Sequence, residues 1–521
     1  MVFNSLDIAV FCLYGVVLSF IAWWVSREKA GHNKTTEDYF LAGKSLPWWA
    51  IGASLISANI SAEQIIGMSG SGFAIGMAIA SYEWMAAITL IIVGKYFLPI
   101  FMAKGIYTMP QFLENRYDHR VRTIMAIFWL GVYILVNLTS VLWLGALAIN
   151  AITGVDMVYG LVFLAVFSIA YSIYGGLKAV AMTDLLQVVL LILGGLLVSY
   201  LALDKIAEGQ GVWQGFSMLL EKVPEKFNMI LEPDNPHYVS LPGLSVLVGG
   251  MWVMNFSYWG FNQYITQRTL AAKSLQEAQK GIAFAAYLKI LMPVIVVLPG
   301  IAAAVLTPEL SKPDQAYPEM MKLVPHGLLG ITFAALVAAV ASSLGSMSNS
   351  ISTIFTMDIY KQMINPDASE KKAVAVGRIV ALISMVIAVV VARPLLGELD
   401  QAFQYIQEFS GFFTPGIVVI FLLGFFWKKA TATSALVAAI SSAVLSLALK
   451  IFWPELPFMD RVGLVFLLCV ALAVIVTLAG GGKDQPNAIE LDGIQFKTQT
   501  SFNIATLGIV LVLIGLYATW W

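Results

Sequence analysis

Apolar windows of roughly 20 residues recur along the whole chain, and no other feature limits its fold as strongly. A window of this length crosses a hydrocarbon core of about 30 Å as one helix. Only 12% of the 521 residues are charged, whereas soluble globular chains are about a quarter charged. Long continuous apolar runs such as LSVLVGGMWVM argue against the short alternating segments of a membrane β-barrel. The sequence therefore predicts an all-α polytopic membrane protein.

The apolar windows divide the chain into about 14 predicted transmembrane helices. They are placed at 7–25, 48–71, 79–102, 122–152, 157–175, 182–204, 243–266, 280–305, 327–358, 374–394, 403–426, 432–452, 462–480 and 502–519.

The Lys and Arg residues predict the orientation of these helices. With the N-terminus outside, the inside loops hold 20 of the 30 Lys and Arg residues and the outside loops hold 6. Positive charge collects on the cytoplasmic side of membrane proteins, so this skew favours that orientation. An even number of helices then leaves both termini outside the plasma membrane, which we expect to be a bacterial inner membrane. Because Arg27 and Lys29 follow the first window and no cation precedes it, we expect a retained helix rather than a cleaved signal peptide.

Several function classes lack any supporting motif. There is no GxxxxGK[ST] for nucleotide binding and no HExxH or CxxC for a transition metal. The predicted loops are too short for an appended catalytic or nucleotide-binding module, so we do not expect an enzyme. The net charge of −1 gives no reason to expect a nucleic-acid partner. Cys12 and Cys469 both lie in apolar windows, and we interpret them as small buried hydrophobes.

Ionisable groups inside the predicted helices are few, and such groups are costly enough to be functional candidates. They are Glu63, Glu83, Asp184, Lys289 and Glu408. Uncharged polar residues cluster in the same helices: Asn59, Ser61, Gln64, Asn255, Asn262, Ser342, Ser343, Gln404 and Gln407. The chemistry is therefore expected between about residues 50 and 410, and the last three helices are interpreted as scaffold.

Two predicted helices are interrupted, by NISAEQIIGMSGSG (59–72) and by MNFSYWGFNQY (254–264). Each is the first of a set of five helices, and an odd number forces the second set to run opposite to the first. Broken helices at corresponding positions of two halves are typical of transporters with inverted repeats. We expect the glycines of the first interruption to let its helix end loosely. The resulting division is 1–47 (an extra helix and loop), 48–204 (first repeat), 205–242 (outside loop), 243–427 (second repeat) and 428–521 (three further helices).

One helical face carries candidate oxygen ligands for a monovalent cation. Ala339, Ser342 and Ser343 lie at i, i+3 and i+4, and such residues share a face. Two hydroxyls together with carbonyls from the broken second helix would suit a hard cation, which prefers oxygen. Small residues at this spacing also allow helices to pack closely. Spacing alone leaves both interpretations open.

Several long stretches resemble the sodium:solute symporter family. They are TTEDYFLAGKSLPWWAIGAS, ANISAEQIIGMSGSG, ASYEWMAAITLIIVGKYFLPIF, YSIYGGLKAVAMTDLLQ, YWGFNQYITQRTLAAKS, NSISTIFTMDIYK and QAFQYIQEFSG. The resemblance runs from about residue 7 to the C-terminus. It implies fourteen helices, a core of two inverted five-helix repeats, and alternating access in which sodium and a sugar move together.

The resemblance also implies roles for particular residues. The family's sugar-binding side chains fall on Gln64, Glu83, Asn255, Lys289 and Gln407. An aromatic gate on the cytoplasmic side falls on Tyr258, with Met68, Tyr82 and Trp259 completing the apolar walls and gates. Sodium is implied to bind the carbonyls of Ser57, Ile60 and Ala339 and the hydroxyls of Ser342 and Ser343, with Asp184 on its path.

Some of these side chains also have plain structural interpretations. Glu83 and Lys289 would form an ion pair between helices, and Asp184 would cap its helix. Two positions depart from the sugar-transporting pattern: Ala86 replaces a sugar-contacting serine, and Ser257 replaces a tyrosine beside the gate. We therefore expect a symporter of sodium and a galactose- or glucose-like hexose. Inositol, sialic acid or an amino acid are alternative solutes, and a channel is a more distant alternative.

Overall fold

The computed structural model describes residues 3–27, 35–397 and 402–521. Helices make up nearly all of the regular structure in this part of the chain. The only extended pairing among the described residues is an isolated bridge between Leu46 and Ala272. The predicted all-helical architecture is therefore confirmed.

The structure contains α-helices, labelled α, and short helical segments with tighter or wider turns, labelled η. From the N-terminus they are α1 (Ser5–Ser26), α2 (Thr36–Phe40), η1 (Ala42–Lys44), α3 (Trp48–Asn59), η2 (Glu63–Met68), α4 (Ser69–Ala74), η3 (Met77–Ala80), α5 (Ser81–Ile92), η4 (Val93–Phe97), α6 (Leu98–Lys104), α7 (Met109–Arg116), α8 (His119–Val132), η5 (Tyr133–Leu138), α9 (Thr139–Thr153) and α10 (Met157–Ile206). They continue with α11 (Val212–Lys222), η6 (Pro224–Phe227), α12 (Leu244–Val248), α13 (Gly250–Asn255), η7 (Phe256–Gly260), α14 (Gln263–Leu270), α15 (Leu275–Leu306), η8 (Pro313–Gln315) and α16 (Ala316–Met321). The last are α17 (Leu328–Ile354), η9 (Phe355–Ile364), α18 (Glu370–Leu396), α19 (Ala402–Gly411), α20 (Thr414–Phe426), α21 (Ala432–Phe452), α22 (Phe458–Ala479) and α23 (Thr500–Thr519).

Ten helical segments among the described residues are long and apolar enough to cross a membrane. Two further apolar helices, Met157–Ala170 and Thr414–Phe426, are shorter. The remaining two predicted spans, 48–71 and 243–266, are the interrupted ones, and neither forms one continuous helix. The prediction of fourteen helices is thus approximate, because four of them do not appear as single long helices.

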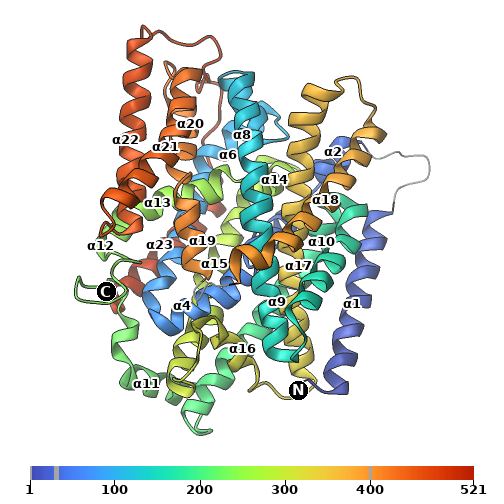
Figure 1. The fold of residues 1–521 in the computed structure, drawn as a ribbon, viewed down its shortest axis with the longest axis vertical. Helices are drawn as coiled ribbons and strands as arrows, with labels where there is room; N and C mark the ends of the chain where they lie inside the picture. Colours follow the sequence, from blue (N-terminus) through green and yellow to red (C-terminus); the bar gives the residue numbers. More distant parts are fainter. Residues whose placement is uncertain (1–2, 28–34, 398–401) are drawn as a thin grey trace.

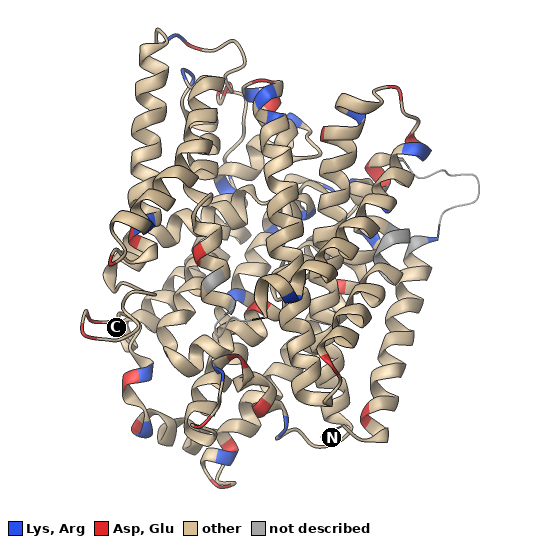
Figure 2. Cartoon of the chain, viewed as in Figure 1, with Lys and Arg blue, Asp and Glu red and all other residues tan. Residues whose placement is uncertain are grey.

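The long helices run side by side, and charged residues gather mainly on the segments that connect their ends (Figures 1 and 2). The N-terminus lies at the lower end of Figure 1, where α11 and α16 also lie. The C-terminal end of α23 is held to the segment that follows α11, because the backbone N–H of Met229 donates to the carbonyl of Trp520 at 2.8 Å. The end of the chain thus contacts the predicted outside loop 205–242, and the N-terminus lies at the same lower end of the molecule as α11 of that loop.

The first interruption breaks the backbone at Ile60. α3 ends at Asn59, and Ile60 has φ −76° and ψ 84°, which lies outside the helical region. The helix resumes at Glu63 in the wider turns of η2 and continues through α4 to Ala74. A break of this kind frees carbonyl and N–H groups that would otherwise bond within the helix. The predicted interruption is confirmed.

The glycines that follow this break do not end the helix, so that prediction is wrong. Gly70 and Gly72 lie inside α4 and serve close packing. A Cβ on Gly72 would lie 2.7 Å from the carbonyl oxygen of Val297, and one on Gly70 would lie 2.6 Å from a carboxylate oxygen of Asp314. The chain turns away only at Gly76, whose φ of +105° few residues with a side chain adopt.

The second interruption lies between η7 and α14. Asn262 has an extended conformation, with φ −83° and ψ 124°, and its side chain accepts a hydrogen bond from the N–H of Tyr264. Asn262 therefore caps the new helix. A further bend separates α12 from α13 at Gly249.

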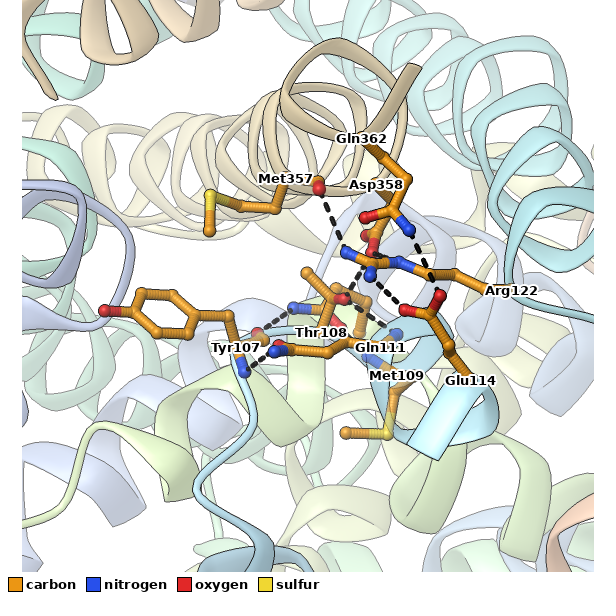
Figure 3. A network of polar contacts seen from close by, with 10 residues as sticks. Tyr107, Thr108, Met109, Gln111, Glu114, Arg122, Met357, Asp358 and Gln362 are labelled. Atoms are coloured by element: carbon orange, nitrogen blue, oxygen red, sulfur yellow. Dashed lines mark hydrogen bonds and ion pairs between the residues drawn. The ribbon is translucent and has the colours of Figure 1, made fainter. Parts of the chain in front are cut away.

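A polar network fastens the ends of α7, α8 and η9 at the end of the molecule opposite the N-terminus (Figure 3). Arg122 Nε donates to Asp358 at 2.7 Å, and Arg122 Nη1 pairs with Glu114. Thr108 Oγ1 donates to the same Asp358 oxygen at 2.9 Å, and Gln362 donates to Glu114 at 3.1 Å. Asp358 is fully buried. The network holds the start of α8 against the end of the α17–η9 helix.

We expect Arg122→Met to lower the apparent melting temperature in detergent by roughly 3 °C or more. The substitution leaves Asp358 as a buried carboxylate without its cation, which costs about 3–5 kcal/mol. Arg120→Met is the matched control, because Arg120 pairs with Asp118 at the exposed surface, with the Arg120 side chain 56% exposed. Equal melting temperatures for the two variants would contradict this prediction.

Candidate functional site

The two broken helices border one internal cavity of about 980 Å³, part of which opens to solvent. Side chains from η2, α5, η7, α15 and α19 meet in it. Its polar lining consists of Asn59, Glu63, Gln64, Tyr82, Glu83, Tyr133, Asn137, Asn255, Ser257, Tyr258, Asn262, Lys289, Gln407, Ser410 and Thr414. A cavity in which a few polar groups converge among aromatic and aliphatic side chains is typical of a small-molecule site.

All five residues predicted to bind sugar line this cavity, although their segments lie far apart in the sequence. Lys289 of α15 forms a buried ion pair with Glu83 of α5. Lys289 also donates to Asn59 Oδ1, and its Nζ lies 5.1 Å from the centre of the Trp259 ring. The structural and the functional interpretation of this pair are therefore compatible, because the pair joins two helices and also faces the cavity.

The side-chain amides of Gln64 and Asn255, on the two broken helices, each use one of their two polar groups in a local hydrogen bond. Gln64 Oε1 accepts from the hydroxyl of Ser61 at 3.0 Å. Asn255 Nδ2 donates to the carbonyl of Met251 at 3.1 Å. Among the described residues no hydrogen bond is made by the Gln64 NH₂ group or by the Asn255 carbonyl oxygen, which leaves one donor and one acceptor for a ligand.

The predicted gate residues form an aromatic wall at the cavity. Tyr258 packs edge-on against Trp259 with ring centres 5.1 Å apart, and Tyr82 packs edge-on against Phe403 at 5.4 Å. The Tyr258 hydroxyl accepts from Asn59 Nδ2 at 3.0 Å and from the hydroxyl of Tyr264 at 2.9 Å. Met68, Ala86 and Ser257 also line the cavity.

Three of the residues predicted to bind sodium are serines, and their side chains meet where α3 packs against α17. Ser343 Oγ donates to the carbonyl of Ala58 at 3.0 Å and lies 3.4 Å from the carbonyl of Ser57. Ser57 Oγ donates to Ser342 Oγ at 2.9 Å. Ser57, Ile60, Ala339, Ser342 and Ser343 are all buried. This donor set is uncharged oxygen, which suits a monovalent hard cation.

Asp184 lies beside these hydroxyls and does not cap its helix. It is buried in the interior of α10, beyond a kink at Gly176. Its carboxylate accepts hydrogen bonds from Ser54 and from Ser342. Asp184 thus contacts one of the predicted sodium ligands directly. Among the described residues there is no group of three or more His, Cys, Asp and Glu side chains that suits a transition metal.

Two residues near the site were missed by the sequence reasoning. Arg268 falls in the loop predicted between the helices 243–266 and 280–305, whereas it is 1% exposed in α14 and donates to the backbone oxygen of Ser54 at 3.0 Å. Tyr264 was not singled out, although its hydroxyl bonds Tyr258. The only signal for either is the polar run NQYITQR directly after the second break.

A helical membrane protein whose broken helices meet at an internal polar cavity has the architecture of a secondary transporter. Residues 39–441 match the sodium:solute symporter family, and the chain belongs to that family. The predicted family and the predicted dependence on sodium as co-transported ion are thereby confirmed.

Individual relatives match most or nearly all of the chain. A "Sodium/glucose cotransporter" of Vibrio parahaemolyticus is 52% identical over 99% of this chain and 98% of the relative. The "Uncharacterized symporter YidK" of Escherichia coli is 34% identical over 99% of this chain and 91% of the relative. A human "Sodium/myo-inositol cotransporter 2" is 33% identical over 85% of this chain and 69% of the relative.

Two solved structures share the fold. A substrate-bound, outward-open Na⁺-coupled sialic acid symporter superposes with a TM-score of 0.80 at 23% identity, covering 91% of this chain and 98% of the other. Mhp1, a nucleobase-cation-symport-1 family transporter, gives a TM-score of 0.52 at 16% identity, covering 88% and 98%.

Proposed function

We propose that the chain couples inward sodium movement to the uptake of a galactose- or glucose-like hexose by alternating access. The observation that carries the proposal is the cavity in which Lys289, Glu83, Gln64, Asn255 and Gln407 converge. A sugar presents hydroxyls that both donate and accept, and this set offers both kinds of partner. The 52% identity to a relative described as a sodium/glucose cotransporter supports the same solute class.

In this proposal the chain contains two structural repeats, each of which begins with a broken helix. Residues 48–204 and 243–427 are two inverted repeats, and the breaks at Ile60 and Asn262 lie in the first helix of each. Sodium contacts Ser57, Ile60, Ala339, Ser342 and Ser343, with Asp184 on its path, while Tyr258, Met68, Tyr82 and Trp259 form the walls and the gate. Both termini face the outside of the membrane. No enzymatic activity is part of the proposal.

The sodium gradient is large enough for this work. One sodium ion that enters down 100 mV and a tenfold concentration ratio releases about 3.7 kcal/mol. At one-to-one coupling this free energy concentrates a neutral sugar several hundred-fold. A single sodium site therefore suffices.

We expect proteoliposomes that contain the protein to accumulate labelled glucose or galactose only with an inward sodium gradient. Replacing external sodium by choline at the same potential should reduce uptake to the level of empty liposomes. Uptake that is indifferent to sodium would overturn the proposal. Competition with myo-inositol, a sialic acid and amino acids ranks the alternative solutes, and accumulation against a gradient excludes a channel.

A further inference from the structure

One charged side chain of the cavity has no role in the proposed function. Among the described residues that line the cavity, only Glu63, Glu83 and Lys289 are charged. Glu83 and Lys289 neutralise each other in their ion pair. Glu63, when ionised, is the third charge.

Glu63 has no cationic partner among the residues that the structure describes. Its Oε1 accepts a hydrogen bond from the hydroxyl of Ser140 in α9, and its own N–H donates to Ser61 Oγ at 3.1 Å. The side chain is 9% exposed and faces the cavity from η2, next to Gln64. Buried carboxylates are normally paired with a cation or a metal. An ionised carboxylate without a cation on a ligand-binding wall is therefore placed to attract or repel a charged ligand.

We infer that Glu63 is a charge filter of the cavity, which admits neutral and ammonium-bearing sugars and rejects sugars that carry a carboxylate. The inference rests on the proposed function, because it names the solutes that the same cavity accepts. Two like charges a few ångströms apart repel strongly where water is scarce, and two opposite charges attract to a similar extent. A uronic acid or a sialic acid places its carboxylate in the same cavity as that of Glu63. A 2-amino-2-deoxy hexose brings a cation instead.

The charge filter distinguishes between the alternative solutes by their charge. Glucose, galactose and inositol carry no charge and satisfy the filter. A sialic acid carries a free carboxylate, and Lys289 is not free to neutralise it because Lys289 already pairs with Glu83. The filter thus favours the neutral polyols over the anionic candidates.

The test compares glucuronate with glucuronamide as competitors of labelled glucose in proteoliposomes. The two molecules have nearly the same size and differ in charge, so steric exclusion affects them alike. In the wild-type protein we expect glucuronamide to compete at least 10-fold more strongly than glucuronate, and glucosamine to compete at least as well as glucose. Equal competition by the acid and the amide would overturn the inference.

The substitution Glu63→Gln assigns this selectivity to the side chain, since glutamine keeps the size and an oxygen for Ser140. We expect it to bring glucuronate within about 3-fold of glucuronamide and to remove the preference for glucosamine, with neutral glucose still transported. Glu319→Gln, at a surface pair with Lys322, controls for net charge.

The outcomes distinguish this inference from the proposed function. If no labelled hexose enters with sodium, the proposed function fails before any competitor is added. If glucose enters and Glu63→Gln leaves the ratio of glucuronate to glucuronamide unchanged, only the charge filter fails. Binding of the unlabelled competitors to purified protein, followed by tryptophan fluorescence, gives the same ratios for a variant that transports slowly.

Discussion

Lys289→Ala is expected to reduce kcat/KM for sodium-driven hexose uptake by roughly 100-fold or more. The substitution removes the only cation that lines the cavity among the described residues and leaves Glu83 as a buried, unpaired carboxylate. It also removes the donor that holds Asn59 Oδ1, and Asn59 in turn holds the hydroxyl of Tyr258. Initial rates of labelled glucose uptake in proteoliposomes measure the loss.

A loss of folding must be separated from a loss of the site. The double variant Glu83→Gln with Lys289→Met removes both charges together, so it avoids the unpaired carboxylate and should recover most of the thermal stability. It should not recover uptake, because the ammonium donor of Lys289 and the charged acceptor of Glu83 are still missing. Lys322→Ala is the matched control, since Lys322 pairs with Glu319 near the surface with side chains 34% and 28% exposed. Near wild-type uptake by Lys289→Ala would refute the role of this pair in sugar binding.

The sequence is informative about the features that the membrane itself enforces. Apolar windows must be long enough to cross the bilayer, and backbone breaks are tolerated only where partners exist. For this reason the interruptions at Ile60 and Asn262 were visible as polar residues inside apolar runs. Glu83 and Lys289 were visible for the same reason, because a charge inside the bilayer is costly unless it has a partner. The residue types alone did not predict which charged side chains form ion pairs with each other.

Features decided by contacts between distant segments were not predictable in this way. Arg268 follows the second break, where a cation reads as part of a loop, yet Ser54 and Ser346 from two other helices enclose it. Gly70 and Gly72 read as helix breakers, whereas the backbone of α15 and the α15–α16 loop pack against them. In both cases the partners lie at least 78 residues away in the sequence, and no local pattern records them.

Ser343→Ala is expected to raise the sodium concentration for half-maximal uptake by about 10-fold or more. Ser343 Oγ lies 3.0 Å from the carbonyl of Ala58 and 3.4 Å from that of Ser57, beside the first break. In the proposed site this hydroxyl is one of five oxygens around the ion. A buried polar partner that is left unmatched costs about 1–3 kcal/mol. Because Ser343 does not line the sugar cavity, saturating sodium should restore hexose uptake to near the wild-type rate.

This dependence on sodium distinguishes a lost ion ligand from a damaged transporter. Ser348→Ala is the matched control, since Ser348 is also buried on the same helix and its hydroxyl makes no hydrogen bond to any described residue. Its half-saturating sodium concentration should remain that of the wild type. The measurement is glucose uptake at a series of sodium concentrations with ionic strength held by choline. If Ser343→Ala and Ser348→Ala give the same curve, Ser343 does not bind the ion, and the site must be sought among the other buried oxygens around Asp184.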